Sequence, residues 1–187
     1  PANCPTIDVT QPDGLQSLAS FDAYGSPGYG ATVGAGELDA GGLHEILTGP
    51  GPSPVYGPHV RAFRRDGSVL AKVSFYAYGT PRYGVNVAAG SVDADSAAEI
   101  LSGAGPGAVF GPHVRGFLGD GTSVAKISFF AYGTLRSGVN VGAPELDVDG
   151  YAEILTGAGP GVVFGPHVRA WNFDGAKLTA IASVNFF

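Results

Sequence analysis

The sequence has no methionine, a single cysteine and few charged side chains. Charged residues make up 14% of its 187 residues, and ten lysines and arginines against sixteen acidic residues give a formal net charge of −6 at pH 7. An acidic chain whose basic residues are scattered argues against a nucleic-acid partner. No apolar run reaches the roughly 18 residues that a membrane-spanning helix requires. We therefore expect no nucleic-acid partner and no membrane span.

Motifs for two common kinds of catalysis are also missing. The glycine-rich stretches at 49–52, 103–107 and 157–161 lack the Lys-Ser or Lys-Thr ending of a phosphate-binding loop. No Gly-x-Ser-x-Gly elbow occurs, and Cys4 has no catalytic partner nearby in the sequence. From these absences we predict that the protein is not an enzyme.

Glycine and proline are abundant, with 31 and 14 residues, and they recur at a fixed period. Phe-x-Ala-Tyr-Gly begins at residues 21, 75 and 129, and Gly-Pro-His-Val-Arg recurs at the same spacing of 54 residues. A fixed period of this length indicates a propeller or another radial β array. We interpret the chain as a single repeat domain, 1–187. It consists of an N-terminal segment with an extra strand at 1–20 and of repeats at 21–74, 75–128 and 129–187.

The second repeat predicts four strands. Residues 84–92 are small and apolar, as in a strand buried on both faces, and residues 98–103 and 112–117 follow as two more strands. Asp120-Gly121 is a hairpin turn into 123–130, which alternates with a period of two. No segment has helical periodicity. Four antiparallel strands are the content of one propeller blade, so we predict an all-β fold of propeller-type blades.

Closure of such an array is not determined by the sequence. Three repeats supply three blades, whereas closed propellers have about four to eight. A copy of the last strand lies at 15–21 with no other strand of its own blade before it, and its edge would be open unless paired. Two chains could close a six-bladed ring, which predicts a homo-oligomer. The alternatives are a piece of a longer array and a pseudo-threefold β-trefoil-like barrel.

Cys4 lies close to the strand that such a ring would exchange. In an exported protein, a leftover cysteine indicates an intermolecular disulfide or a free thiol. A position near the N-terminus makes pairing between chains sterically easy. We therefore consider a dimer linked through Cys4, with an inert thiol as the alternative.

The acidic stretch 145–153 carries the clearest chemical signal. Glu145, Asp147 and Asp149 stand at alternate positions, and Glu153 follows four residues later. A hard cation takes about six to eight oxygen ligands, and a tight loop directs alternate side chains to one point. Gly150 permits the turn between them. This pattern predicts a Ca²⁺ site.

Corresponding loops occur in the two earlier repeats. Their acidic residues are Asp93, Asp95 and Glu99 in the second repeat and Glu37, Asp39 and Glu45 in the first. Ser91 takes the first ligand position of the second loop, and Gly41 replaces the central carboxylate of the first. Because fewer anionic ligands lower calcium affinity, we expect the third loop to bind most tightly and the first most weakly. Solvated acidic turns are the alternative interpretation.

The order of these features resembles the FG-GAP repeat. Tyr83-Gly84, a small apolar strand, the acidic loop 93–95, Glu99-Ile-Leu and Gly103-Ala-Gly-Pro follow one another as in that family. FG-GAP repeats form the calcium-binding blades of integrin α-chain propellers and of many secreted bacterial proteins. The resemblance covers residues 15–187. It implies calcium between the first two strands of each blade, an extracellular location, and adhesion to or recognition of an extracellular protein or glycan.

The Gly-Pro-His-Val-Arg segments offer a possible second site. Its residues are His59, His113 and His167 together with Arg61, Arg115 and Arg169. Within a strand, each histidine and the arginine two positions later share a face. Three convergent histidines would suit a transition metal, as in a metalloenzyme, or an anion site with the arginines. The alternative is that these side chains hold the blades together through backbone carbonyls or Glu45, Glu99 and Glu153.

Repeated aromatic residues are the last candidate binding surface. Tyr24, Tyr78 and Tyr132 recur beside glycines, with Tyr29 and Tyr83 as additional rings. Sugars stack on flat aromatic surfaces, which would make the protein a carbohydrate-binding lectin. Rings at fixed blade positions also fill the space between sheets. Our principal hypothesis is an extracellular calcium-binding repeat module for adhesion or recognition.

Overall fold

The computed structural model describes most of the chain, and all regular elements in that part are β-strands. The described residues are 6–10, 17–25, 28–79, 82–93, 95, 97–107, 111–134, 137–161 and 165–187. The predicted all-β class is confirmed. Cys4 lies outside the described residues, so its disulfide stays a prediction. No helix in the described ranges is long and apolar enough to cross a membrane.

The strands form three four-stranded antiparallel sheets, which we call blades, and one smaller sheet. None of the sheets closes into a barrel within the described part of the chain, so the β-trefoil-like alternative is wrong there. Blade 1 contains β3 (Ala31–Gly36), β4 (Glu45–Pro50), β5 (His59–Phe63) and β6 (Val69–Tyr76). Blade 2 contains β7 (Val85–Gly90), β8 (Glu99–Ala104), β9 (His113–Phe117) and β10 (Ser123–Thr134). Blade 3 contains β11 (Val139–Gly142), β12 (Ile154–Ala158), β13 (Val168–Phe173) and β14 (Leu178–Phe186).

The predicted hairpin turn has a local cause. In blade 2, the Oδ1 atom of Asp120 accepts a hydrogen bond from the backbone N–H of Thr122 at 2.8 Å. Gly121 has a φ of 86°, which a residue with a side chain adopts only at a cost. Asp66 and Gly67 repeat this arrangement in blade 1. The Asp-Gly pairs therefore reverse the chain between the third and fourth strands.

The N-terminal part forms a two-stranded sheet, which we call the half-blade. In it, β1 (Thr6–Thr10) runs antiparallel to β2 (Ser17–Asp22). The expectation of a lone strand at 15–21 was wrong, because β1 precedes this strand and pairs with it. Residues 6–10 read Thr-Ile-Asp-Val-Thr and share no motif with the third strands of the blades. The 54-residue period therefore gave no sign of β1.

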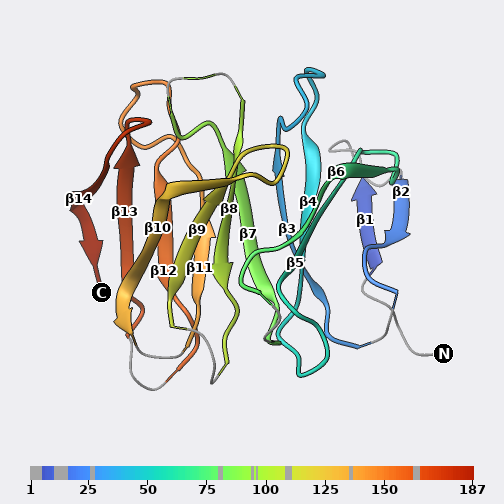
Figure 1. Ribbon diagram of the computed structural model, residues 1–187, viewed down its shortest axis with the longest axis horizontal. Coiled ribbons are helices and arrows are strands. Elements are labelled where there is room, and N and C mark those ends of the chain that lie inside the picture. The colour runs from blue at the N-terminus through green and yellow to red at the C-terminus, as the bar shows by residue number, and fades with distance from the viewer. Residues whose placement is uncertain are drawn as a thin grey trace.

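The half-blade and the three blades lie side by side in chain order, with the half-blade and blade 3 at opposite ends (Figure 1). An apolar cluster joins each sheet to the next. Buried members of these clusters are Ile7 and Phe63 beside the half-blade, Leu47 and Ile100 between blades 1 and 2, and Ile127 and Ile154 between blades 2 and 3. The core is thus a series of layers between sheets.

Glycines on the second strands set the spacing of the blades. Gly49 on β4 lies against the backbone oxygen of Val85, and Gly103 on β8 lies against that of Val139 in blade 3. A Cβ atom at either position would overlap the oxygen. The recurrent glycine in Glu-Ile-Leu-x-Gly therefore permits the inner strands of adjacent blades to approach closely.

Candidate metal site

Each acidic loop connects the first and second strands of a blade. The three loops lie along the same edge of the molecule (Figure 1). In each loop, ligand atoms from all the acidic residues lie within 4.8 Å of one another. The three groups are Glu145, Asp147, Asp149 and Glu153; Asp93, Asp95 and Glu99; and Glu37, Asp39 and Glu45. The structure therefore brings together the acidic residues that the sequence singled out, with one group in each blade.

The carboxylate of Glu145 organises the backbone of the third loop. Its Oε1 atom accepts hydrogen bonds from the N–H groups of Asp147 at 3.2 Å and Val148 at 2.7 Å. Its Oε2 atom accepts one from Gly150 at 2.8 Å. Val148 and Gly150 have positive φ values of 65° and 95°, so the chain turns sharply here. This turn keeps the alternate carboxylates close together.

One glutamate of each loop is buried at or next to the start of the second strand. The exposed fractions are 4%, 1% and 1% for Glu45, Glu99 and Glu153. One carboxylate oxygen of each, Oε2, accepts a hydrogen bond from a loop N–H group, which belongs to Leu38, Val92 and Leu146 in turn. The Oε1 atoms of Glu99 and Glu153 are buried and have no hydrogen-bond partner among the described residues. Buried acceptors of this kind are rare and costly.

The buried glutamates have unusual electrostatics. Burial, followed by the charges of Asp93 and Asp95, raises the pKa of Glu99 to about 7, although the N–H group of Val92 acts in the opposite direction. Burial and the neighbouring loop carboxylates also raise the pKa of Glu153. Both shifts indicate that the ionised carboxylates lack compensating positive charge. A cation held by the second loop and another held by the third would supply this positive charge.

The second loop shows what the serine at its first position does. The Oγ atom of Ser91 donates to the backbone carbonyl of Asp95 at 2.7 Å. The Oδ1 atoms of Asp93 and Asp95 accept the N–H groups of Asp95 and Ala97 at 3.0 and 2.8 Å. Ser91 therefore shapes the loop by a hydrogen bond where Glu145 does so with a carboxylate, and the second loop carries one less negative charge.

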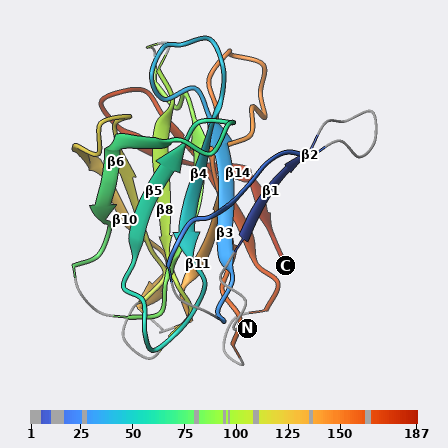
Figure 2. The same ribbon diagram turned by 90° about the vertical axis from the view of Figure 1, so that its right-hand side faces the viewer.

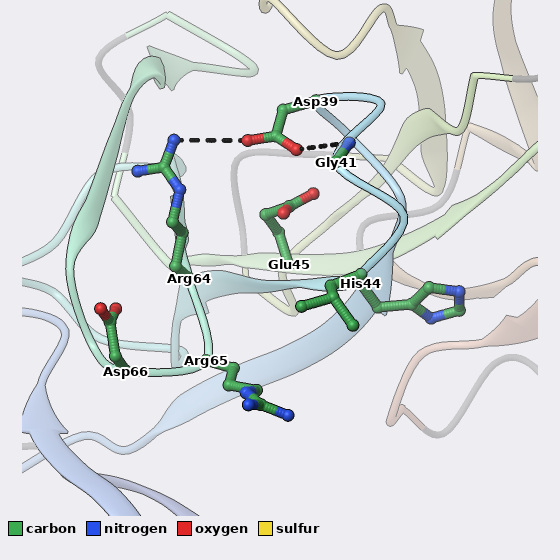
Figure 3. Close-up of a pocket in the computed structure, with 8 residues that line it drawn as sticks. Asp39, Gly41, His44, Glu45, Arg64, Arg65 and Asp66 are labelled. Atoms are coloured by element: carbon green, nitrogen blue, oxygen red, sulfur yellow. Dashed lines mark hydrogen bonds and ion pairs between the residues drawn. The ribbon is translucent and has the colours of Figure 1, made fainter.

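The first loop is contacted by a cationic side chain from the turn between β5 and β6, which sequence reasoning missed. Figure 3 shows the Arg64 guanidinium facing Asp39, with Nη2 at 3.3 Å from the Asp39 Oδ2 atom. The other oxygen of Asp39 accepts the N–H group of Gly41 at 3.0 Å. Leu118 and Asn172 stand at the positions of Arg64 in the later repeats. A position-by-position comparison of the three repeats would have singled out Arg64, but not its pairing with Asp39.

The first loop also borders a cavity of about 340 Å³. Its acidic lining residues are Asp39, Glu45 and Asp66, and its basic ones are His44, Arg64 and Arg65. The side chains of His44 and Arg65 point away from the Asp39–Arg64 pair (Figure 3). None of these three basic residues has a basic counterpart in the second or third repeat. The first loop is therefore the only one of the three that is bordered by such a basic cluster among the described residues.

The histidines of the Gly-Pro-His-Val-Arg segments belong to separate blades. Each ring is held by a polar side chain of the neighbouring strand and stacks on an aromatic ring. The polar partners are Ser74 Oγ at 3.0 Å, Ser128 Oγ at 3.0 Å and Asn185 Oδ1 at 2.6 Å for His59, His113 and His167 in turn. No histidine belongs to a metal-ligating group in the described ranges. The structure therefore does not bring the three histidines together.

The arginines of the same segments join neighbouring sheets. Nη1 of each donates to a backbone carbonyl at the end of the preceding sheet, and each guanidinium lies over an aromatic ring. The carbonyls belong to Ala23, Ala77 and Ala131, and the rings to Phe63, Phe117 and Trp171, for Arg61, Arg115 and Arg169 in turn. These contacts fit the alternative in which the segments hold the blades together.

The repeated tyrosines are not available as a binding surface. Tyr24, Tyr78 and Tyr132 are 4%, 8% and 7% exposed. Each hydroxyl donates to the backbone carbonyl of the histidine in the next blade, at 2.8, 2.7 and 2.9 Å. A lectin that uses these three rings is therefore excluded, because a sugar cannot stack on a buried ring.

Comparison with known proteins supports the fold. No family model matches the chain, and no curated protein sequence does. Among solved structures, the chain is similar to that of rhamnogalacturonan lyase YesW, with a TM-score of 0.51 and 16% sequence identity. The match covers 96% of this chain and 36% of that one, so this chain spans about a third of the lyase's length. At this identity, the likeness shows the fold alone.

The same comparison overturns the prediction that the protein is not an enzyme. That prediction rested on missing motifs for phosphate binding and acyl transfer. An enzyme matches almost the whole length of this chain in fold. The absence of motifs for two reaction types therefore does not exclude catalysis.

Proposed function

We propose that the protein is a calcium-binding repeat module, with cations held in the acidic loops of blades 2 and 3. The observation that carries this proposal is the pair of buried Oε1 atoms of Glu99 and Glu153, which have no hydrogen-bond partner among the described residues. Each belongs to a group of carboxylates whose ligand atoms lie within 4.8 Å of one another. A bound cation would give both oxygens a partner and would offset the repulsion within each group.

Calcium suits these loops better than a transition metal does. The groups contain only carboxylates, and neither histidine nor cysteine belongs to them in the described ranges. Hard oxygen ligands in a loop of irregular geometry are typical of Ca²⁺, whereas Mg²⁺ demands a stricter octahedron. The third loop, with four carboxylates, should bind more tightly than the second, with three.

We further propose an extracellular location and a role in adhesion or recognition, with an extracellular protein or glycan as partner. The support is the resemblance of the three repeats to FG-GAP repeats, including the acidic loop and the glycine-rich segment after the second strand. A calcium-dependent pull-down from the native extracellular medium tests the partner. Recovery of the same material with and without chelator would contradict calcium-dependent recognition.

Calcium titration of thermal unfolding tests the metal site. A ligand that binds only the folded state stabilises it, by about 2.7 kcal/mol for each site at a hundredfold excess over the dissociation constant. We expect Ca²⁺ to raise the melting temperature of the chelator-treated protein, and Glu99→Gln and Glu153→Gln each to reduce this rise. Glu45→Gln is the matched control because Arg64 supplies positive charge to the first loop. A full calcium response in both Glu99→Gln and Glu153→Gln would disprove the proposal.

The stability of Glu99→Gln without calcium separates metal binding from simple destabilisation. Burial raises the pKa of Glu99 from 4.5 to about 7, so the folded state retains a proton that the unfolded chain loses. The stability of the calcium-free protein should therefore fall as pH rises from about 4.5 through 7. Glu99→Gln should remove this loss and make the calcium-free protein more stable at pH 8, by about 1–3 kcal/mol. Denaturant unfolding at pH 5 and pH 8 measures the difference.

A second candidate function is recognition of an acidic polysaccharide. It is favoured by the fold shared with a rhamnogalacturonan lyase and by His44 and Arg65 at the cavity beside the first loop. A guanidinium pairs well with a carboxylate, which is the charged group of a uronic acid. We expect galacturonate oligomers to bind more tightly than neutral oligosaccharides, and Arg65→Ala to abolish the difference. Arg82→Ala, outside the cavity, is the control for non-specific charge. Equal binding of charged and neutral sugars would exclude this candidate.

A further inference from the structure

The half-blade reproduces the outer half of a blade. Phe21 on β2 packs on Phe63 with ring centroids 4.7 Å apart, as Phe75 packs on Phe117 at 4.5 Å. The carbonyl of Ala23, just after β2, accepts a hydrogen bond from Arg61 in the next blade. The carbonyl of Ala77, just after β6, accepts one from Arg115 in the same way. Since β2 takes the place of a fourth strand and β1 pairs with it, β1 takes the place of a third strand.

The described part of the chain has no strands that correspond to the first and second strands of this sheet, which we call its inner strands. In each blade, the third strand pairs with the fourth on one edge and with the second on the other. In the half-blade, β1 pairs with β2, and no described strand pairs with its other edge. An edge of this kind presents backbone N–H and C=O groups to an additional strand.

The missing strands leave part of blade 1 uncovered. Val33 on β3 is 59% exposed, whereas the equivalent Val87 on β7, which blade 1 covers, is 5% exposed. Ala35 is likewise exposed, while Ala89 packs against the cluster between blades 1 and 2. The difference has a geometric cause, since β3 has only the outer strands of a sheet in front of it.

These surfaces line an open groove of about 750 Å³. Figure 2 shows the side of the molecule on which β1 and β3 lie. One wall is β1, from Thr6 to Thr10, and the other is the face of β3 that carries Ala31, Val33 and Ala35, together with Ile46. The groove is continuous with the apolar cluster that joins the half-blade to blade 1, to which Ile7, Val9 and Ala31 belong. In the rest of the molecule, the equivalent space is filled by the first and second strands of a blade.

We propose that this groove binds a pair of inner strands of the repeat's own kind, supplied by a polypeptide segment outside blades 1 to 3. The second strand of the pair would add to the free edge of β1, and the first would cover Val33. The chemistry that fits is a run of small apolar residues, an acidic turn and a Glu-Ile-Leu-x-Gly strand, as in residues 84–105. The groove thus recognises main-chain hydrogen-bonding groups and small side chains together.

A synthetic peptide with the sequence of residues 84–105 tests this proposal on the full chain. This copy is the suitable probe because blade 2 packs against a blade on each face. We expect the fluorescently labelled peptide to bind and to slow amide hydrogen exchange in Thr6–Thr10. A scrambled peptide of the same composition should do neither. Absence of binding at millimolar peptide, or binding without protection of β1, would overturn the proposal.

A matched pair of variants locates the binding surface. Val33→Glu places a charge in the groove, whereas Val55→Glu places one at a similarly exposed valine that does not line it. We expect Val33→Glu to weaken peptide binding by about tenfold or more, because a buried apolar contact is lost, and Val55→Glu to leave it unchanged. Equal effects of the two variants would overturn the proposal. Protection of β1 by self-association at high protein concentration, without peptide, would assign the groove to a second copy of the chain instead.

Discussion

At the scale of single residues, one tyrosine hydroxyl ties each sheet to the next. The hydroxyl of Tyr78 donates to the carbonyl of His113 at 2.7 Å and lies 3.0 Å from the Oγ atom of Ser102. Burial is the main cause that raises the pKa of Tyr78 far above its ordinary value of 10. The phenol therefore stays protonated in the folded state.

This arrangement predicts a loss of stability in alkali. Above pH 10 the unfolded chain ionises its tyrosines, while the folded state keeps the proton of Tyr78, so the free energy of unfolding falls as pH rises. Tyr78→Phe should cost about 1–3 kcal/mol at neutral pH because the carbonyl loses its donor, and it should make the alkaline loss smaller. Tyr76→Phe, at an exposed ring, is the control. Denaturant unfolding between pH 7 and pH 11 measures both effects, and identical pH profiles for Tyr78→Phe and the parent chain would contradict this account.

The ligand residues differed in how well the sequence predicted them. The alternation of Glu145, Asp147 and Asp149 is visible in one chain, because loop ligands lie close together in sequence. The pairing of Arg64 with Asp39 joins residues 25 positions apart across a blade, so only the folded chain reveals it. For the same reason, the buried and unpartnered state of the Glu99 and Glu153 oxygens had no sequence signal.

At the scale of elements, strand positions followed the pattern closely. The first three predicted strands of the second repeat lie within two residues of β7, β8 and β9. Turn chemistry explains this success, since Asp-Gly pairs and glycine-rich stretches mark the strand ends. The strand β1 was missed because residues 6–10 lack the Gly-Pro-His-Val-Arg motif that marks the third strand in the blades. Burial of the repeated tyrosines also depends on the neighbouring sheet, which a strand pattern does not describe.

The spacing between blades makes a prediction for glycine. Gly103→Ala should destabilise the fold by about 1–3 kcal/mol, because the new Cβ would overlap the backbone oxygen of Val139 and push blades 2 and 3 apart. Gly25→Ala is the matched control, since nothing lies within 4 Å of a Cβ built there. Chemical denaturation of the two variants measures the difference. Equal stabilities would mean that the blades adjust without cost.

At the scale of the whole molecule, the homo-oligomer expected from the repeat count stays a prediction. Phe186 is 54% exposed on blade 3, although Phe21, Phe75 and Phe129 each pack under an aromatic ring of the next blade. The blade 3 end therefore presents an apolar contact that the other sheets bury. Light scattering with and without reductant measures the molar mass. A dimer that becomes a monomer on reduction would support the linkage through Cys4, and a monomer in both conditions would contradict the paired ring.

The pairing of Arg64 with Asp39 bears on how the chain would respond to its surroundings. A guanidinium attached by a covalent bond cannot be removed by a chelator or diluted away, whereas the calcium proposed for the other two loops can. Withdrawal of calcium should therefore loosen the chain unevenly, with the repeats nearest the C-terminus losing order while the first keeps its shape. The molecule would then have one end that senses the ionic composition of its medium and one end that ignores it.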